Sequence, residues 1–323
     1  MLPISRCILA IDSGGSKCDA VLVRDDGTLL GQGHCTWNDP HSGRSQFGSG
    51  RSENSVRKAV LAALGDIRCD ELVFATYRDN FGLGKLVWKY TQTLRFFNAT
   101  EHEPILFLNH VPEGIVVIAG TGGAVYCKWR GRRPTHFDGL GPVLGDAGSG
   151  YHIGLLALRA VAKSTWHPRH ATSLTLRVMQ ALNLTDPSLG RKNLVQFSLN
   201  NPDRAEVASL AALVDCEANA GDAIAQAILR QAADAMTETI FDAVSSLGLA
   251  EEEFPLVGAG SVAVHSTRYW EHLCTQVSTY APRAIPMRSS LPPVLGMALL
   301  VLQKYGTDEY ARMEHRLLEQ FTA

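Results

Sequence analysis

Three glycine-rich turns, each following a short apolar run, are the stretches of this sequence whose residue types could do chemistry. They are "DSGGSK" from Asp12, "TGG" from Thr121 and "GAGS" from Gly258. Glycine turns expose consecutive backbone N–H groups, which can form a concave anion site because no side chain stands in the way. Asp12 adds a carboxylate at the end of a predicted strand. The pattern predicts phosphate binding, although a tight hairpin or an Asx turn would need the same residue types.

The first two turns belong to a repeated pattern of strand, glycine turn and resumed strand. Aligning Ile8 with Ile115 also aligns Gly15 with Gly122, which suggests two related lobes that each carry a phosphate-facing hairpin. The sequence has no G-x-x-x-x-G-K-[ST] motif, so a P-loop fold is disfavoured. The predicted phosphate-binding residues are Gly14, Gly15 and Ser16 in the first turn and Thr121, Gly122 and Gly123 in the second.

Length and composition limit the class of protein. A chain of 323 residues is long for one compact core, so two lobes are expected. The net charge of −2 provides no electrostatic footprint for nucleic acid or an anionic membrane. The seven cysteines are scattered and never spaced as C-x-x-C, and no apolar run is long enough to span a bilayer. We therefore expect a cytoplasmic protein with reduced thiols that binds neither nucleic acid nor membranes.

Hydrophobic periodicity predicts the elements that position these turns. A three-stranded antiparallel meander is expected at the N-terminus, followed by a polar loop over 37–54 and a helix over 52–67. A strand is predicted over 70–77, and the segment Lys85–Phe97 is predicted to be helical. Further helices are expected over 174–184, 203–220, 222–247 and 291–305, with a strand over 253–262. We expect an N-terminal lobe of residues 1–113, joined by a C-terminal helix at about 305–323, and a C-terminal lobe of residues 114–304.

With its motifs in this order, most of the chain resembles the N-acetylglucosamine kinase and BadF/BcrA ATPase group of the sugar kinase–Hsp70–actin superfamily. The resemblance rests on "IDSGGSKCDAVLV", "GIVVIAGTGG", "GLGPVLGDAGSGYHIG", "ANAGDAIAQAIL" and "VGAGSV". It implies an α/β, two-lobed actin-like ATPase fold of the ribonuclease H-like type. Each lobe would be a mixed sheet with flanking helices, with the nucleotide in the cleft between them. The resemblance also implies ATP and Mg²⁺, a small-molecule sugar substrate and, as one option, a homodimer.

The same resemblance assigns roles to individual residues. Asp12 would face Mg²⁺ through water, and Asn38 and Asp146 would contact the sugar. Gly139 and Leu140 stand where the family has part of its sugar-site Gly-Gly-Trp-Gly pattern, and Ala147 stands where it has a glutamate, which leaves the identity of the sugar open. The adenosine side would be formed by Gly221, Gly258, Gly260 and Ser261. Asp146 could instead cap the helix that follows it, and Gly221-Asp222 could form a simple helix break.

The predicted general base departs from the family pattern. Kinases of this family carry an aspartate there, and counting back from Gly114 brings that position to Glu101 or one to two residues earlier. Ala99 and Thr100 cannot accept a proton, so Glu101 is the predicted base. The alternative is that Glu101 is a solvated loop acid.

Three functions follow from these residues. The first is an ATP-dependent kinase acting on N-acetylglucosamine or a related amino sugar. The second is a non-catalytic sensor of ATP or sugar that has lost the base aspartate. The third is an ATPase activator of an acyl-CoA dehydratase or reductase, which the lack of paired cysteines disfavours.

Overall fold

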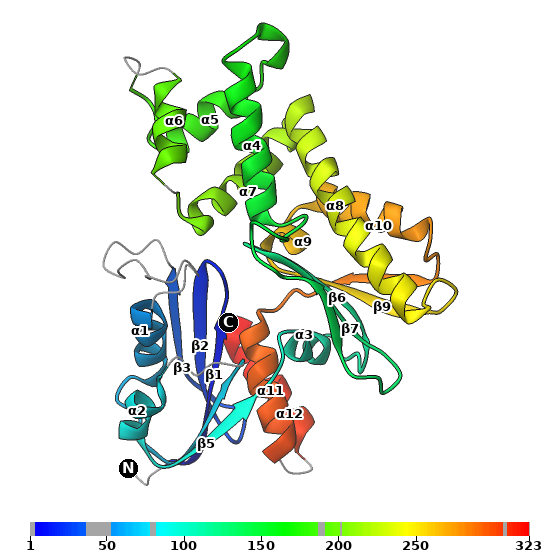
Figure 1. The fold of residues 1–323 in the computed structure, drawn as a ribbon. Coiled ribbons are helices and arrows are strands. Elements are labelled where there is room, and N and C mark those ends of the chain that lie inside the picture. Colours follow the sequence, from blue (N-terminus) through cyan, green and yellow to red (C-terminus); the bar gives the residue numbers. More distant parts are fainter. Residues whose placement is uncertain are drawn as a thin grey trace. The chain divides into compact units, whose positions relative to one another are not determined.

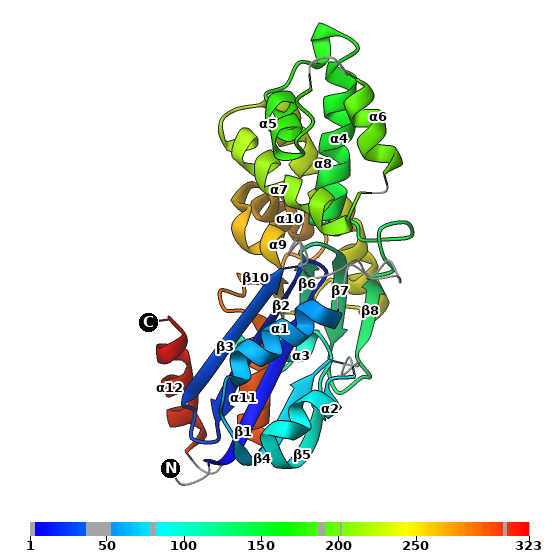
Figure 2. The same ribbon diagram turned by 90° about the vertical axis from the view of Figure 1, so that its left-hand side faces the viewer.

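The computed structural model describes residues 4–36, 53–77, 82–186, 191–200, 202–305 and 309–322. The chain forms two compact units, which are described separately below. The first comprises Met1–Pro112 and Ser289–Ala323, and the second comprises Glu113–Arg288. Figures 1 and 2 show the fold of each unit from two directions.

The first unit is built on a five-stranded mixed sheet in the order β3-β2-β1-β4-β5. β1, β2 and β3 form the predicted antiparallel meander, and β4 and β5 extend the sheet parallel to β1. The strands are β1 (Ile4–Ser13), β2 (Lys17–Arg24), β3 (Leu29–Thr36), β4 (Cys69–Thr76) and β5 (Thr91–Asn98).

Helices cover both faces of this first sheet (Figures 1 and 2). α1 (Glu53–Leu64) packs on β2 and β3, while α11 (Pro293–Tyr305) packs on β1, β4 and α3 (His102–Leu108). α12 (Tyr310–Thr322) packs against α11 and β3. The prediction that the C-terminal lobe extends to residue 304 is therefore wrong for residues 289–304. They join the first unit because the apolar residues of α11 share a core with Ile8 and Ala10 of β1.

The predicted helix over Lys85–Phe97 is also wrong. Only a short helix α2 (Gly84–Val87) and a 3₁₀ turn η1 (Trp88–Tyr90) precede β5, which pairs in parallel with β4. The sequence of β5, "TQTLRFFN", contains threonines and adjacent phenylalanines, which favour a strand. Phe96 packs edge-on against Phe74 of β4 with ring centroids 5.9 Å apart.

The second unit repeats the sheet of the first. Its strand order is β10-β9-β6-β7-β8, in which β6, β7 and β8 are antiparallel neighbours and β9 and β10 run parallel to β6. The strands are β6 (Gly114–Ala119), β7 (Gly123–Lys128), β8 (Thr135–Asp138), β9 (Phe254–Ala259) and β10 (Ala284–Arg288). The two sheets have the same order and strand directions, which confirms the predicted pair of related lobes.

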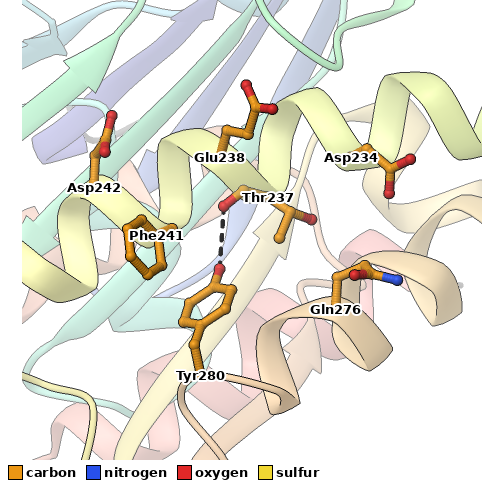
Figure 3. A pocket seen from close by; sticks show the side chains of 7 residues that line it. All are labelled: Asp234, Thr237, Glu238, Phe241, Asp242, Gln276 and Tyr280. Carbon is orange, nitrogen blue, oxygen red and sulfur yellow. Dashed lines mark hydrogen bonds between the residues drawn. The ribbon is translucent and has the colours of Figure 1, made fainter.

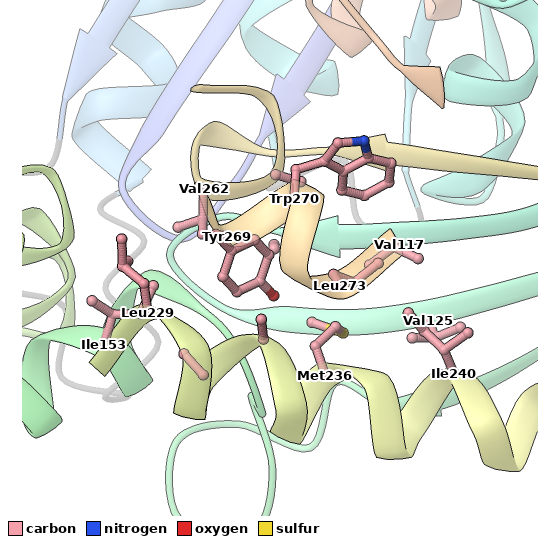
Figure 4. Packing of buried hydrophobic residues seen from close by; sticks show 14 of the residues in the cluster. Val117, Val125, Ile153, Leu229, Met236, Ile240, Val262, Tyr269, Trp270 and Leu273 are labelled. Carbon is pink, nitrogen blue, oxygen red and sulfur yellow. The ribbon is translucent and has the colours of Figure 1, made fainter. Parts of the chain in front are cut away.

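Helices make up most of the rest of the second unit. They are α4 (Gly150–Ser164), η2 (Pro168–His170), α5 (Leu174–Ala181), α6 (Lys192–Leu199), α7 (Arg204–Asn219), α8 (Ala223–Leu247), α9 (Ser261–His265) and α10 (Thr267–Ser278). Figure 4 shows α8 and α10 packing on the sheet, with Met236 and Ile240 of α8 near Val125 of β7. No helix of the described ranges is long and apolar enough to cross a bilayer.

Candidate active site

The first glycine turn joins β1 to β2 at the top of their antiparallel ladder. Asp12 pairs with Asp19 in the last rungs of this ladder, and the N–H of Gly14 donates to the carbonyl oxygen of Lys17 at 2.9 Å. Within the part of the chain that the structure describes, the N–H groups of Gly15 and Ser16 have no intramolecular acceptor. The turn therefore presents two consecutive backbone donors, as a phosphate site requires.

Asp12 lies in the same hairpin, near the carboxylates of Asp19 and Glu101 and the side chain of Lys17. Burial and the neighbouring carboxylates of Asp19 and Glu101 raise the pKa of Asp12 to about 6, although Lys17 and a hydrogen bond with Tyr77 oppose the shift. Asp19 itself is paired, since its carboxylate lies 2.8 Å from Nζ of Lys17 and 2.5 Å from Nδ1 of His34. Asp12 is thus the carboxylate at this turn that would gain most from a bound cation.

Glu101 is positioned by the start of α3. The N–H and the hydroxyl of Thr100 donate to the Glu103 carboxylate at 2.6 and 2.8 Å, which ties the first turn of α3 to the residue before it. Glu103 accepts these two hydrogen bonds, whereas the half-buried Glu101 acts on Asp12 through its charge. Asp12 and Glu101, the two predicted catalytic residues, are 89 positions apart in the sequence. In the structure they lie close enough for the charge of Glu101 to raise the pKa of Asp12.

The second glycine turn joins β6 to β7 and is fixed by the start of α4. The N–H groups of Gly150 and Tyr151 donate to the carbonyl oxygens of Gly120 and Thr121 at 2.7 and 3.2 Å. Among the described residues, the N–H groups of Thr121 and Gly122 have no acceptor, so this turn also presents two consecutive donors. They occupy nearly the same place in the repeated hairpin as the free donors of the first turn.

Gly123 differs from its neighbours in the second turn. Its N–H donates to Oδ1 of Asp146 at 3.1 Å, so it is not available to a phosphate in this conformation. Asp146 is only 3% exposed, and its second oxygen forms an ion pair with Arg204, the first residue of α7. The backbone N–H of Asp146 donates in turn to the carboxylate of Asp138 at 2.7 Å.

These contacts place Asp146 inside the second unit, next to the second glycine turn. Burial raises its pKa, while Arg204 and the Gly123 amide act in the opposite direction. The helix cap considered as an alternative is wrong, because the cap of α4 is Ser149, whose hydroxyl accepts the N–H of His152 at 3.1 Å. A sugar contact for Asp146 remains a prediction, and it would have to share a carboxylate whose two oxygens already accept hydrogen bonds.

The loop after β8 contains the remaining predicted sugar residues. Gly139 has a left-handed backbone with φ of 73°, and Leu140 is 65% exposed. Their contact with a sugar remains a prediction. Asn38 lies outside the described residues.

The predicted adenosine turn follows β9. Gly260 has φ of 86°, and a Cβ there would lie 2.6 Å from the carbonyl of Ala119, so this turn packs backbone to backbone against the second glycine turn. Ser261 begins α9 directly after it. Gly258 lies within β9, where a Cβ would be 2.5 Å from the ring of Trp270. The need for glycine at position 258 is therefore explained by packing.

Gly221 is part of the turn between α7 and α8. It has φ of 102°, and Asp222 caps α8 by accepting the N–H groups of Ile224 and Ala225 at 2.9 and 2.8 Å. α7 begins beside Gly122 and has 16 residues, so its far end lies roughly 24 Å away. The helix break considered as an alternative explains the glycine at 221, and a contact of Gly221 with the nucleotide stays a prediction.

Arg204 and Asp138 lie in the network around the second glycine turn, and neither was among the predicted site residues. Arg204 lies 58 residues from Asp146 and follows Asp203, an ordinary N-cap of α7, so no local motif marks it. Asp138 ends β8 with φ of 62°, a conformation typical of glycine. The one sequence signal that could have identified Asp138 is its position directly before Gly139, where the motif "GLGPVLGDAGSGYHIG" begins.

A hollow of about 540 Å³ lies apart from these residues, between α8 and α10 (Figure 3). None of the predicted site residues lines it. The acidic side chains that line the hollow do not suit a phosphate. At its edge, the hydroxyl of Tyr280 donates to the carbonyl oxygen of Thr237 at 3.1 Å. The lining residues are Asp234, Thr237, Glu238, Phe241, Asp242, Gln276 and Tyr280.

Comparison with known proteins agrees with this architecture. An N-acetyl-D-glucosamine kinase of Dictyostelium discoideum is 33% identical over 313 residues, which cover 91% of this chain and 97% of the relative. An N-acetylmuramic acid/N-acetylglucosamine kinase of Clostridium acetobutylicum is 30% identical over 46% of this chain and 48% of its own. A candidate N-acetylglucosamine kinase from Chromobacterium violaceum has a similar fold, with a TM-score of 0.65 at 20% identity over 93% of this chain and all of that one. Residues 9–301 match the BadF/BadG/BcrA/BcrD ATPase family, so this chain is a member of that family.

Proposed function

We propose that this protein is an ATP-dependent kinase that phosphorylates a hydroxyl group of N-acetylglucosamine or a closely related amino sugar. The observation that carries the proposal is a pair of glycine turns in the corresponding hairpins of two repeated sheets, each with two consecutive N–H groups that have no acceptor among the described residues. The Dictyostelium relative, which aligns over nearly its whole length, supports the class of acceptor.

The glycine turns are suited to hold the phosphates of ATP. Each offers two consecutive N–H donors in a rigid hairpin, at Gly15 and Ser16 and at Thr121 and Gly122. Phosphoryl transfer depends mainly on positioning and on neutralising charge, which backbone donors provide without reorganising. Gly260 and Ser261 remain the predicted contacts on the adenosine side.

Asp12 fits a role in holding Mg²⁺ through water. Its pKa is raised by burial and by two neighbouring carboxylates, so a cation would relieve the repulsion. The described residues contain no group of three His, Cys, Asp or Glu side chains that could hold a metal by themselves. Mg²⁺ commonly binds one or two carboxylates together with water and substrate phosphates, which agrees with a single Asp12. When bound, the cation would offset the negative charge on the transferred phosphoryl group.

Glu101 is the proposed general base. The sugar hydroxyl oxygen forms a bond to the γ-phosphorus while the bond from that phosphorus to the bridging oxygen breaks. The hydroxyl proton goes to the Glu101 carboxylate, and ADP leaves with the electron pair of the broken bond. Asn38, Gly139, Leu140 and Asp146 remain the predicted contacts of the sugar.

The experiment is to measure ADP release with Mg²⁺ and ATP across a panel of hexoses and amino sugars. We expect turnover that depends on an N-acetylated amino sugar and falls by about 10²-fold or more in Glu101→Gln. Glu103→Gln is the matched control, because Glu103 sits two positions away and accepts hydrogen bonds from Thr100. It should retain turnover, since the side-chain oxygen of glutamine can still accept from Thr100.

Two outcomes contradict parts of this proposal. Turnover that survives Glu101→Gln would exclude Glu101 as the base. Nucleotide binding without turnover for any sugar would favour the sensor, which the replacement of the family's aspartate makes the second candidate.

A further inference from the structure

Arg204 lies at the second glycine turn, although no sequence motif marks it. A Cβ added to Gly122 would lie 2.2 Å from Nη2 of Arg204 and 2.9 Å from Oδ1 of Asp146. The guanidinium is therefore packed directly against the backbone of the turn. The absence of a side chain at Gly122 leaves the space that the guanidinium occupies.

The hydrogen bonds of this guanidinium are incomplete. Nη2 donates to Asp146, but the buried Nε–H has no acceptor among the described residues. A buried donor without an acceptor is costly, and such groups usually indicate a missing water, ion or ligand. The N–H groups of Thr121 and Gly122, which have no acceptor in the described part of the chain, lie in the same turn.

We propose that Arg204 is a catalytic residue that binds the terminal phosphate of a nucleoside triphosphate at the second glycine turn, where Asp146 holds it in place. This inference rests on the proposed function, because it assigns the nucleotide to this turn. Arginine offers five donors in a planar fork that matches phosphate oxygens, and it remains charged at every physiological pH.

Asp146 acts in this arrangement as a positioning residue. One of its oxygens accepts the Gly123 N–H and the other binds Arg204, so a single buried carboxylate ties the guanidinium to the turn. The carboxylate of Asp138 holds the backbone of Asp146 and Ala147 by accepting their N–H groups at 2.7 and 2.8 Å. The turn, the arginine and the two aspartates thus form one connected network within the second unit.

The proposal predicts a specific change in nucleotide preference. Arg204 should strengthen binding of a triphosphate more than binding of a diphosphate, because only the triphosphate carries the terminal group. The affinities of ADP and of the non-hydrolysable β,γ-imido analogue of ATP can be compared by isothermal titration calorimetry. Loss of one charge-assisted contact corresponds to about a tenfold to hundredfold reduction in the preference for the triphosphate.

Two variants separate this role from support of the fold. Arg204→Met alone leaves Asp146 buried without its partner, so it is combined with Asp146→Asn, which keeps an acceptor for Gly123. Arg204→Lys keeps the charge but loses the fork, and it should fall between the wild type and the double variant. In both, kcat should decrease by up to about 10²- to 10³-fold.

Arg177→Gln is the matched control. It removes the ion pair between Arg177 and Glu217, which are 3.2 Å apart near the far end of α7. Glu217 is 13 residues from Arg204 along this helix, or roughly 20 Å. The control should leave the ratio of ADP to triphosphate affinity and the turnover unchanged.

The results distinguish the inference from the proposed function. A folded double variant that keeps the wild-type ratio of affinities would overturn the role of Arg204, even if its turnover fell. A normal ratio combined with an increased KM for the sugar would assign Asp146 to the sugar instead. If the wild type binds both nucleotides but phosphorylates no sugar, the kinase proposal fails while the affinity ratio still tests Arg204. If the wild type binds neither nucleotide, both fail.

Discussion

Asp12 of β1 pairs with Asp19 of β2 across the antiparallel hairpin, directly below the first glycine turn. Residues opposite each other in such a ladder direct their side chains to the same face of the sheet. The carboxylate of Asp19 contacts Lys17 and His34, whereas the pKa of Asp12 is raised to about 6 by burial and by the charges of Asp19 and Glu101. The fold therefore disfavours the charged form of Asp12, and a pKa shifted in this way is common at functional sites.

The first prediction concerns the stability of Asp12→Asn. Because the pKa of Asp12 in the folded protein exceeds that of the unfolded chain, the folded state binds more protons between about pH 4 and pH 6. Stability contributed by protonated Asp12 is present at low pH and lost as pH rises through 6. In the absence of Mg²⁺, Asp12→Asn should therefore be more stable than the wild type at pH 8, by about 1–2 kcal/mol, and the difference should shrink at pH 5.

Urea denaturation at the two pH values measures this effect, with Asp26→Asn as a control of opposite sign. Although burial acts against it, hydrogen bonds with Thr28 and the charges of Arg24 and Arg316 lower the pKa of Asp26. The stability contributed by ionised Asp26 is present at neutral pH and lost in acid. Asp26→Asn should therefore be less stable than the wild type at pH 8, by under about 1 kcal/mol. If Asp12→Asn were also destabilised at pH 8, the electrostatic interpretation of the first turn would be wrong.

The second prediction concerns Gly122→Ala. The new methyl group would lie 2.2 Å from Arg204, so the guanidinium or the turn must move. We expect nucleotide affinity to decrease by about tenfold or more, as measured by calorimetry. Gly131→Ala is the control, since Gly131 lies at the opposite end of β7 with φ of 68° and open space around it.

Gly131→Ala should cost about 1 kcal/mol of stability through backbone strain and leave nucleotide affinity intact. Equal loss of affinity in the two variants would mean that Gly122 acts only through general stability. Normal affinity in Gly122→Ala would remove the second turn from the nucleotide site.

The repeated hairpins were predictable because their signal is local. A buried strand, a glycine turn and a resumed strand all fall within about 16 residues, and Ile8 and Ile115 begin the pattern in the two units. β5 was mispredicted for the opposite reason. β5 is a strand because it pairs with β4, which is too distant in the sequence for local periodicity to reveal the pairing. Buried and exposed side chains also do not alternate strictly along β5.

The network around Arg204 was beyond sequence reasoning for a similar reason. Arg204 reaches Asp146 only because α7 packs along α4, which brings residues 58 positions apart together. Conversely, Gly258 was assigned to the nucleotide because a glycine required by packing and one required by a ligand have the same appearance in a sequence. The coordinates show that Trp270 leaves no room for a side chain at position 258, while the nucleotide contact of Gly258 stays a prediction.

The last prediction tests that distinction with Gly258→Ala. A Cβ at this position would lie 2.5 and 2.6 Å from two ring carbons of Trp270, so the indole must shift within the core formed by β9 and α10. Overpacking of this kind costs about 1–3 kcal/mol. The variant should unfold at lower urea concentration with altered tryptophan fluorescence, yet bind ADP with wild-type affinity at concentrations of urea where it is folded. Weakened ADP binding in the fully folded variant, with Trp270 fluorescence unchanged, would instead place Gly258 against the nucleotide.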